Sequence, residues 1–247
     1  MNSLTGKTVV VTGSSRGVGA DTGKILAAAG AKVVINYRSK APRAEKVVAA
    51  IKEAGGEAIA VGADITQADQ AENLVNAALE AFGSLDYLVL NASGGMEKGM
   101  VEDYAMILNR DSQLALAKLA AQKMPAGGRI VFVTSHQAHF IDRVETMDEY
   151  RPVALSKKAG EQALLEQVPA FKERGISLVV VSADMIEGTV TASLLNRLHP
   201  GALEARRQEA GKLYTVAEFA QEVARMLTAQ VPSGHIELVG GAKGFIS

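Results

Sequence analysis

The 247 residues of the chain are enough for one α/β domain, and a hydrophobic content of 48% is enough for a sizeable core. The formal net charge of −1 and the lack of a basic tract argue against nucleic-acid partners and acidic membrane surfaces. The chain has no cysteine, which excludes disulfides and a cysteine nucleophile, and no spacing of histidine and acidic residues suggests a metal site. No apolar run approaches the ~18 residues of a membrane span, so we expect a cytoplasmic protein.

Short β-branched segments alternate with longer segments rich in Ala, Leu, Lys and Glu. Most of the short segments are continuous apolar runs, which are typical of parallel strands buried on both faces. The predicted strands are residues 8–11, 32–36, 58–63, 87–91, 129–135, 177–182 and 235–239. The predicted helices are residues 17–29, 42–54, 67–82, 101–123, 152–174 and 216–228.

This alternation predicts one domain over residues 1–247, with the doubly wound, seven-stranded parallel sheet of a Rossmann fold and helices on both of its faces. Gly30, Gly55 and Gly83 close three of the predicted helices, and we expect left-handed caps at these positions. The stretch 188–211 has short helical patterns and a break at His199-Pro200-Gly201. We expect this stretch to form a flap over the substrate.

A glycine-rich turn follows the first predicted strand, with the sequence Thr12-Gly13-Ser14-Ser15-Arg16-Gly17-Val18-Gly19. Three glycines at a strand–helix junction let the backbone turn tightly and approach a pyrophosphate closely. The helix that follows offers free N–H groups and the positive end of its dipole. Glycines also serve ordinary turns, but this position after a strand and before a helix favours a dinucleotide site.

The turn and several later motifs resemble the short-chain dehydrogenase/reductase family over essentially residues 4–243. The later matches come in the family's order: Asp64, Asn91-Ala92-Ser93-Gly94, Asn109, Ser135, Ser156-Lys157 and Gly240-Gly241. The resemblance implies an oxidoreductase that acts on CH–OH or C=O groups with a nicotinamide cofactor. The residues expected to contact the cofactor are Gly13, Ser15, Arg16, Val18, Gly19, Tyr37, Arg38, Asp64, Ile65, Asn91, Ala92, Ser93, Lys157 and Ile186.

The end of the second predicted strand bears on the choice of nicotinamide. It reads Ile35-Asn36-Tyr37-Arg38 and lacks the acidic residue that holds the ribose hydroxyls of NAD(H). Arg16 and Arg38 could both face a 2′-phosphate, because guanidinium binds phosphate bidentately. The sequence therefore favours NADP(H) over NAD(H), with two solvated surface arginines as the alternative.

The catalytic residues implied by the resemblance are Asn109, Ser135, a tyrosine and Lys157. In the family the tyrosine stands four residues before the lysine, and here that position is Val153, which has no proton to give. We therefore expect Tyr150, seven residues before Lys157, to act as the proton donor. Pro152 favours the first position of a helix, so Tyr150 is expected in the loop before that helix.

Other readings of the catalytic site stay open. His136 and His139 follow Ser135 and could donate the proton, because histidine titrates near neutral pH. Asp184 stands where the family has a glycine, and the segment between Gly94 and Asn109 is shorter than usual. We therefore expect the part of the site that binds the substrate to differ in shape from the family's.

The favoured function is an NADP(H)-dependent ketone or 3-oxoacyl reductase, or a secondary-alcohol dehydrogenase, with a small-molecule substrate. The resemblance also implies a homo-oligomer, either a dimer or a tetramer. One alternative is a degenerate relative that binds NADP(H) as a sensor or structural ligand without turnover. Another is a reductase in which the substrate's own hydroxyl supplies the proton.

Overall fold

The computed structural model describes residues 4–97 and 99–246 of the chain. In this part of the chain, seven parallel strands form one sheet in the order β3-β2-β1-β4-β5-β6-β7. The strands are β1 (Thr8–Val11), β2 (Lys32–Tyr37), β3 (Glu57–Gly62), β4 (Tyr87–Leu90), β5 (Arg129–Ser135), β6 (Ser177–Ala183) and β7 (His235–Val239). The sheet confirms the predicted doubly wound fold, because the order of the strands reverses its direction between β1 and β4.

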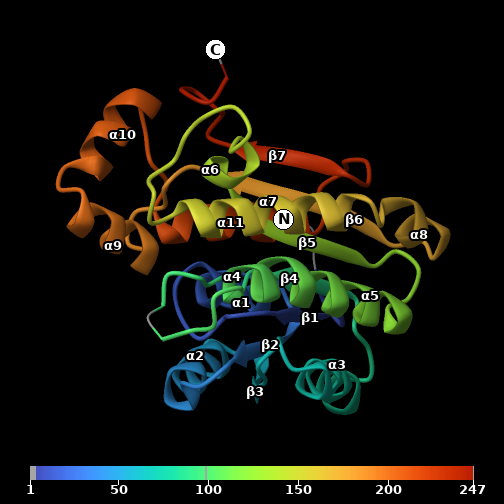
Figure 1. Cartoon of the computed structure of the whole chain (residues 1–247). Helices are drawn as coiled ribbons and strands as arrows, with labels where there is room; N and C mark the ends of the chain where they lie inside the picture. Colours follow the sequence, from blue (N-terminus) through green and yellow to red (C-terminus); the bar gives the residue numbers. More distant parts are fainter. Residues whose placement is uncertain (1–3, 98, 247) are drawn as a thin grey trace.

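Helices cover both faces of the sheet (Figure 1). One face carries α1 (Gly17–Ala28), α2 (Ala41–Glu53) and α11 (Val216–Met226). The other carries α3 (Ala68–Phe82), α5 (Gln113–Lys123) and α7 (Arg151–Leu165). Successive strand residues point to opposite faces, so Val9 and Val11 pack with the first set of helices and Val10 packs with the second. Burial on both faces explains why the strands read as continuous apolar runs.

Two of the predicted helices are interrupted. Residues 101–123 form the short helix α4 (Tyr104–Met106), a π-helix η1 (Ile107–Ser112) and α5. Residues 151–174 form α7 and a separate α8 (Val168–Glu173), with Pro169 in the first turn of α8. Proline has no N–H for the preceding turn, which accounts for the second interruption. A π-helix adds one residue to a turn, and a hydrophobic pattern does not reveal it.

Short helices lie beyond the carboxyl ends of the strands (Figure 1). The stretch 188–211 forms α9 (Val190–Leu198) and α10 (Ala202–Ala210), separated at the predicted His199-Pro200-Gly201 break. Helix α6 (His136–His139), which follows β5 directly, is absent from the prediction because one turn is too short for a periodic pattern.

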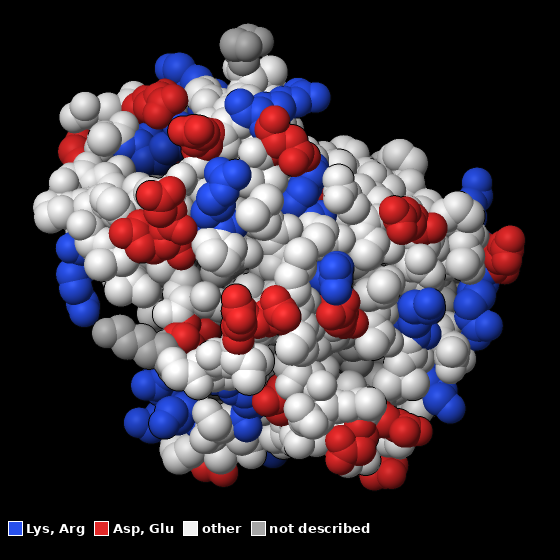
Figure 2. Space-filling view, in the orientation of Figure 1, with Lys and Arg blue, Asp and Glu red and all other residues white. Residues whose placement is uncertain are grey.

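Acidic and basic side chains are interspersed over the face shown in Figure 2, in line with the net charge of −1. Within the described residues, no helix is long and apolar enough to cross a membrane.

Candidate active site

The glycine-rich turn between β1 and α1 has the backbone shape that a close approach of phosphate requires. Gly13 and Gly17 have φ angles of 60° and 58°, in the left-handed region that favours glycine. A Cβ on Gly19 would lie 2.5 Å from the side-chain nitrogen of Asn91. The first turn of α1, all of which is described, has no acidic side chain, and Arg16 makes no side-chain cap. The free N–H groups at this helix end therefore fit an anionic phosphate.

Asn36, at the end of β2, holds the turn in place. Its Oδ1 accepts a hydrogen bond from the Gly13 N–H at 3.1 Å, and its amide nitrogen donates to the Ala63 carbonyl at 3.0 Å. The Asn36 N–H donates to the Ser14 Oγ at 2.9 Å. Asn36 is buried and its amide is hydrogen-bonded within the protein, so it does not bind a ribose. The sequence shows only that this residue is not acidic. That Asn36 holds the turn could not be predicted, because its hydrogen bonds join segments that follow separate strands.

Thr12 fastens the end of β4 to the same turn. Its Oγ1 accepts hydrogen bonds from the backbone N–H groups of Asn91 at 2.9 Å and Ala92 at 3.0 Å. The Asn91 amide donates in turn to the Thr12 carbonyl at 3.0 Å. These bonds join the turn and the Asn91-Ala92-Ser93 segment into one wall.

Arg38 lies just past the end of β2 and is exposed. Its guanidinium donates a hydrogen bond to the Tyr104 hydroxyl and lies 5.7 Å from the centre of the Tyr104 ring. Asp64, expected to contact the cofactor, accepts hydrogen bonds from the N–H and the hydroxyl of Thr66 at 3.0 and 2.8 Å. The other residues predicted at this end are Ser15, partly exposed in the glycine-rich turn, Tyr37, partly exposed at the end of β2, and Ile65, which is buried.

A cavity of about 350 Å³ opens at the carboxyl ends of the central strands, between the glycine-rich turn and the segment 188–211. The predicted site residues that line it are Arg16, Val18, Asn91, Ser93, Ser135, Tyr150, Lys157 and Ile186. Its apolar lining includes Met96, Val153, Met185, Ala192, Leu194 and Leu195. Sequence reasoning missed most of this apolar wall, because it comes from three separate segments whose approach depends on the fold.

Tyr150 and Ser135 meet inside this cavity. The Tyr150 hydroxyl lies 3.0 Å from the Ser135 Oγ, and Tyr150 is only 7% exposed. Ser135 ends β5 and caps α6 by accepting a hydrogen bond from the Ala138 N–H at 3.2 Å. Tyr150 directly precedes α7, in the place predicted from Pro152, and packs in one apolar cluster with Val153. The chain therefore brings a phenol to the serine from outside the helix.

Burial raises the pKa of the Tyr150 phenol, and the hydrogen bond with Ser135 lowers it in part. No charged group among the described residues contributes to this pKa. The phenol therefore stays protonated at neutral pH, which suits a proton donor.

Lys157 lies on α7 one helical turn beyond Val153, and its side chain lines the cavity. Burial lowers the pKa of Lys157 to about 8. Among the residues that the structure describes, none forms an ion pair or accepts a hydrogen bond from the ammonium group. Lys157 is only partly buried and its side chain faces the cavity, so a ligand with hydroxyl or anionic oxygens fits this position.

Asn109 lies in the π-helix and does not line the cavity. Its Nδ2 donates to the Gly94 carbonyl at 2.8 Å and to the Ser156 Oγ at 2.9 Å. A Cβ on Gly160 of α7 would overlap the Asn109 carbonyl oxygen, so glycine allows the two helices to pack closely. Asn109 thus links the helix that carries Lys157 to the loop after β4.

Both histidines after Ser135 point to other parts of the structure. The His136 ring is fully buried, with Nδ1 2.8 Å from the Ser182 Oγ and Nε2 2.8 Å from the Gly241 carbonyl oxygen. The Nδ1 of His139 lies 2.7 Å from the Glu161 Oε1. Neither ring lines the cavity, so the geometry favours Tyr150 over both as the proton donor.

Known proteins resemble the chain in sequence and in fold. The family model described as short chain dehydrogenase matches residues 7–197. An uncharacterised oxidoreductase of Methylorubrum extorquens is 36% identical over 243 residues, which cover 94% of this chain and 97% of the relative.

Two solved structures resemble the chain over almost its whole length. One is a short chain dehydrogenase from Burkholderia cenocepacia in complex with NADP, with a TM-score of 0.82 and 30% identity, covering 98% of this chain and 99% of that one. The other is an angucycline C-6 ketoreductase with bound NADP, with a TM-score of 0.83 and 27% identity, covering 100% of this chain and 98% of that one.

Proposed function

Because the chain belongs to the short-chain dehydrogenase/reductase family, we propose that it is an NADP(H)-dependent oxidoreductase that interconverts ketones and secondary alcohols. Two similar proteins were solved with NADP bound, which supports this cofactor. The exposed guanidinium groups of Arg16 and Arg38, and the lack of an acid at the end of β2, support the phosphorylated form.

The chain's own residues account for cofactor binding in three places. The glycine-rich turn and the free N–H groups of α1 hold the pyrophosphate, and Arg38 holds the 2′-phosphate. Lys157 holds the ribose next to the nicotinamide, because its ammonium faces the cavity without a protein partner. When bound, NADPH supplies the hydride that reduces the carbonyl carbon.

The observation that carries the proposal is the 3.0 Å contact between the Tyr150 hydroxyl and the Ser135 Oγ inside the cavity. The Ser135 hydroxyl binds the carbonyl oxygen of the substrate, and the Tyr150 phenol gives that oxygen its proton. Asn109 positions α7, and with it Lys157, through the hydrogen bond to Ser156. Tyr150 thus performs from the loop the role that Val153 cannot perform from the helix.

The cavity also indicates the chemical class of the substrate. Its two cationic side chains, Arg16 and Lys157, are used by the cofactor, and the remaining charged groups are the acids Glu97 and Asp184. Much of the rest of the lining is apolar, so an uncharged, largely apolar ketone fits better than a carboxylate. This assignment favours a ketone reductase over an enzyme for charged 3-oxoacyl substrates.

Turnover with a panel of cyclic and aryl ketones tests the proposal, with the absorbance of NADPH as the readout. We expect oxidation of NADPH that depends on the ketone, and little oxidation with matched keto acids. Binding of NADPH without turnover on any ketone would support the alternative, a non-catalytic NADP(H)-binding protein, which the valine at position 153 favours.

A further inference from the structure

The segment that follows β6 carries two acidic side chains, one of which lines the cavity. Asp184 lines the cavity itself, where the family pattern has a glycine, and Glu187 follows three residues later. The Asp184 Oδ1 accepts a hydrogen bond from the Met185 N–H at 2.7 Å. A carboxylate that is only 12% exposed needs further compensation for its charge.

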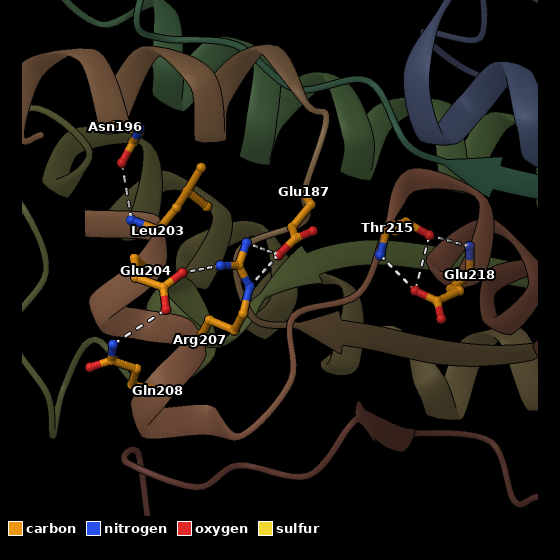
Figure 3. A network of polar contacts seen from close by, with 8 residues as sticks. All are labelled: Glu187, Asn196, Leu203, Glu204, Arg207, Gln208, Thr215 and Glu218. Carbon is orange, nitrogen blue, oxygen red and sulfur yellow. Dashed lines mark hydrogen bonds and ion pairs between the residues drawn. The ribbon is translucent and has the colours of Figure 1, made fainter. Parts of the chain in front are cut away.

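That compensation comes from consecutive arginines of α10. The Arg206 Nε donates to the Asp184 Oδ2 at 2.6 Å, and the Nη2 of Arg207 donates to the Glu187 Oε1 at 2.6 Å. Figure 3 shows Arg207 reaching from α10 to Glu187 and to Glu204 of its own helix. The Arg206 side chain is 13% exposed and that of Arg207 is 43% exposed. Solvent and salt screen a buried pair less, so the Arg206–Asp184 pair is the stronger anchor.

Arg206 also joins α10 to the C-terminal segment. Its Nη2 donates to the Lys243 carbonyl at 2.8 Å, and its guanidinium lies 4.2 Å from the centre of the Phe245 ring. None of the nine residues of α10, all of which the structure describes, is fully buried. Leu203 and Ala210 of this helix are partly buried against the apolar cluster that contains Leu195 and Leu213, and the enclosed polar contacts of Arg206 add to this apolar packing.

We propose that Arg206 is a positioning residue that sets the size of the ketone that the cavity accepts. Its ion pair with Asp184 fixes α10, and thereby α9 and the wall of the cavity that Ala192 and Leu195 contribute. The inference rests on the proposed ketone reductase activity, because it concerns which ketones that activity reaches.

The expected consequence is a change in substrate selection with little change in chemistry. With the pair intact, the wall encloses a compact ketone beside Tyr150. Without it, the wall moves outward, so compact ketones lose contacts and larger ketones gain room. Arg206 does not line the cavity, and therefore the affinity for NADPH stays nearly the same.

Steady-state kinetics with cyclohexanone and 2-tetralone test the inference in Arg206→Met, which keeps an apolar stem against Phe245, and in Arg206→Lys. We expect the KM for cyclohexanone to rise about tenfold in Arg206→Met, as loss of a charge-assisted contact implies. The KM for 2-tetralone should stay or fall, and Arg206→Lys should recover part of the loss. Arg225→Met, which breaks ion pairs with Glu222 and Glu237 on α11 and β7, is the matched control and should change neither. The inference would be overturned if Arg206→Met left both KM values unchanged or shifted them by the same factor.

Hydrogen exchange of residues 190–210 in the NADPH complex gives a second readout that needs no turnover. We expect faster exchange in Arg206→Met and no further increase in the double variant, because both lack the ion pair with Asp184. Asp184→Asn alone should give a smaller increase, since Arg206 keeps its contacts with Glu209, Lys243 and Phe245. Additive effects or wild-type exchange in these variants would contradict the anchoring role. Should Arg206→Met not fold, Asp184→Asn breaks the same pair. Because exchange does not require activity, its result separates failure of the anchor from failure of the proposed reductase function.

Discussion

Val153 occupies the helix position that the family pattern gives to a tyrosine, and the hydroxyl near Ser135 comes from Tyr150. Val153 is 3% exposed and fills the position one turn before Lys157, while Tyr150 supplies a hydroxyl to Ser135 from the loop. The phenol is buried among apolar side chains, so its pKa is raised and it keeps its proton. This environment favours proton donation during ketone reduction over proton removal during alcohol oxidation at neutral pH.

The lowered pKa of Lys157 predicts that the affinity for the cofactor depends on pH. Its pKa in the folded protein is about 8, below the ordinary value of 10.5, so the amine loses its proton as the pH rises through 8. The anionic cofactor favours the ammonium form, so binding takes up a proton above this pH and weakens by up to about tenfold per pH unit. Fluorescence titration with NADPH between pH 7 and pH 9.5 should show this decline in the wild type.

Lys157→Met is the matched variant for that titration. It keeps a side chain of similar length without the charge, and its weaker binding of NADPH should lack the decline above pH 8. An identical pH profile in both proteins would assign the effect to another group.

We expect Arg38 to determine the preference for NADPH over NADH. Arg38→Ala should weaken NADPH binding about ten- to hundredfold, because a charge-assisted bond to phosphate contributes roughly 1.5–3 kcal/mol. The affinity for NADH, which lacks the 2′-phosphate, should stay the same and serves as the internal control. Calorimetric titration with both cofactors measures the two values, and an equal loss for NADH would mean that Arg38 does not act on the 2′-phosphate.

Among the elements, the strands were the most predictable part of the fold. Their ends were predicted to within one residue, because the middle of most strands is a continuous buried run of apolar side chains, mainly valine, isoleucine and leucine. The π-helix around Asn109 was missed, because its extra residue depends on packing against Gly160 and on the hydrogen bond to Ser156. Such a local departure from helical period comes from tertiary contacts that no local pattern contains.

Gly160→Ala tests this packing between α7 and the π-helix. The new Cβ overlaps the backbone oxygen of Asn109, which cannot rotate away, so we expect a loss of about 1–3 kcal/mol in the free energy of unfolding. Gly23→Ala on α1 is the control, because its Cβ would meet only side-chain atoms, the tip of Ile35 at 2.7 Å and a methyl of Val33 at 3.6 Å. Urea denaturation compares the two. A loss in Gly23→Ala as large as that in Gly160→Ala would show that the contact with Asn109 is not special.

At the scale of the whole molecule, the sequence could predict where the contiguous motifs of the candidate site lie in the fold. The glycine-rich turn, Asn91 and Ser135 lie at the ends of predicted strands, and Lys157 lies within a predicted helix. The ion pair of Asp184 with Arg206 and the apolar wall of the cavity could not be predicted. They depend on where the segment 188–211 lies relative to the sheet, and no periodic sequence pattern determines that position.

We expect Tyr150 to give the proton during ketone reduction, and single-turnover kinetics can measure this step. NADPH oxidation by cyclohexanone should be about 10²- to 10⁴-fold slower in Tyr150→Phe than in the wild type, with NADPH affinity nearly intact. His136→Ala, which removes a buried ring away from the cavity, should lose stability but keep the single-turnover rate. A wild-type rate in Tyr150→Phe would contradict the claim.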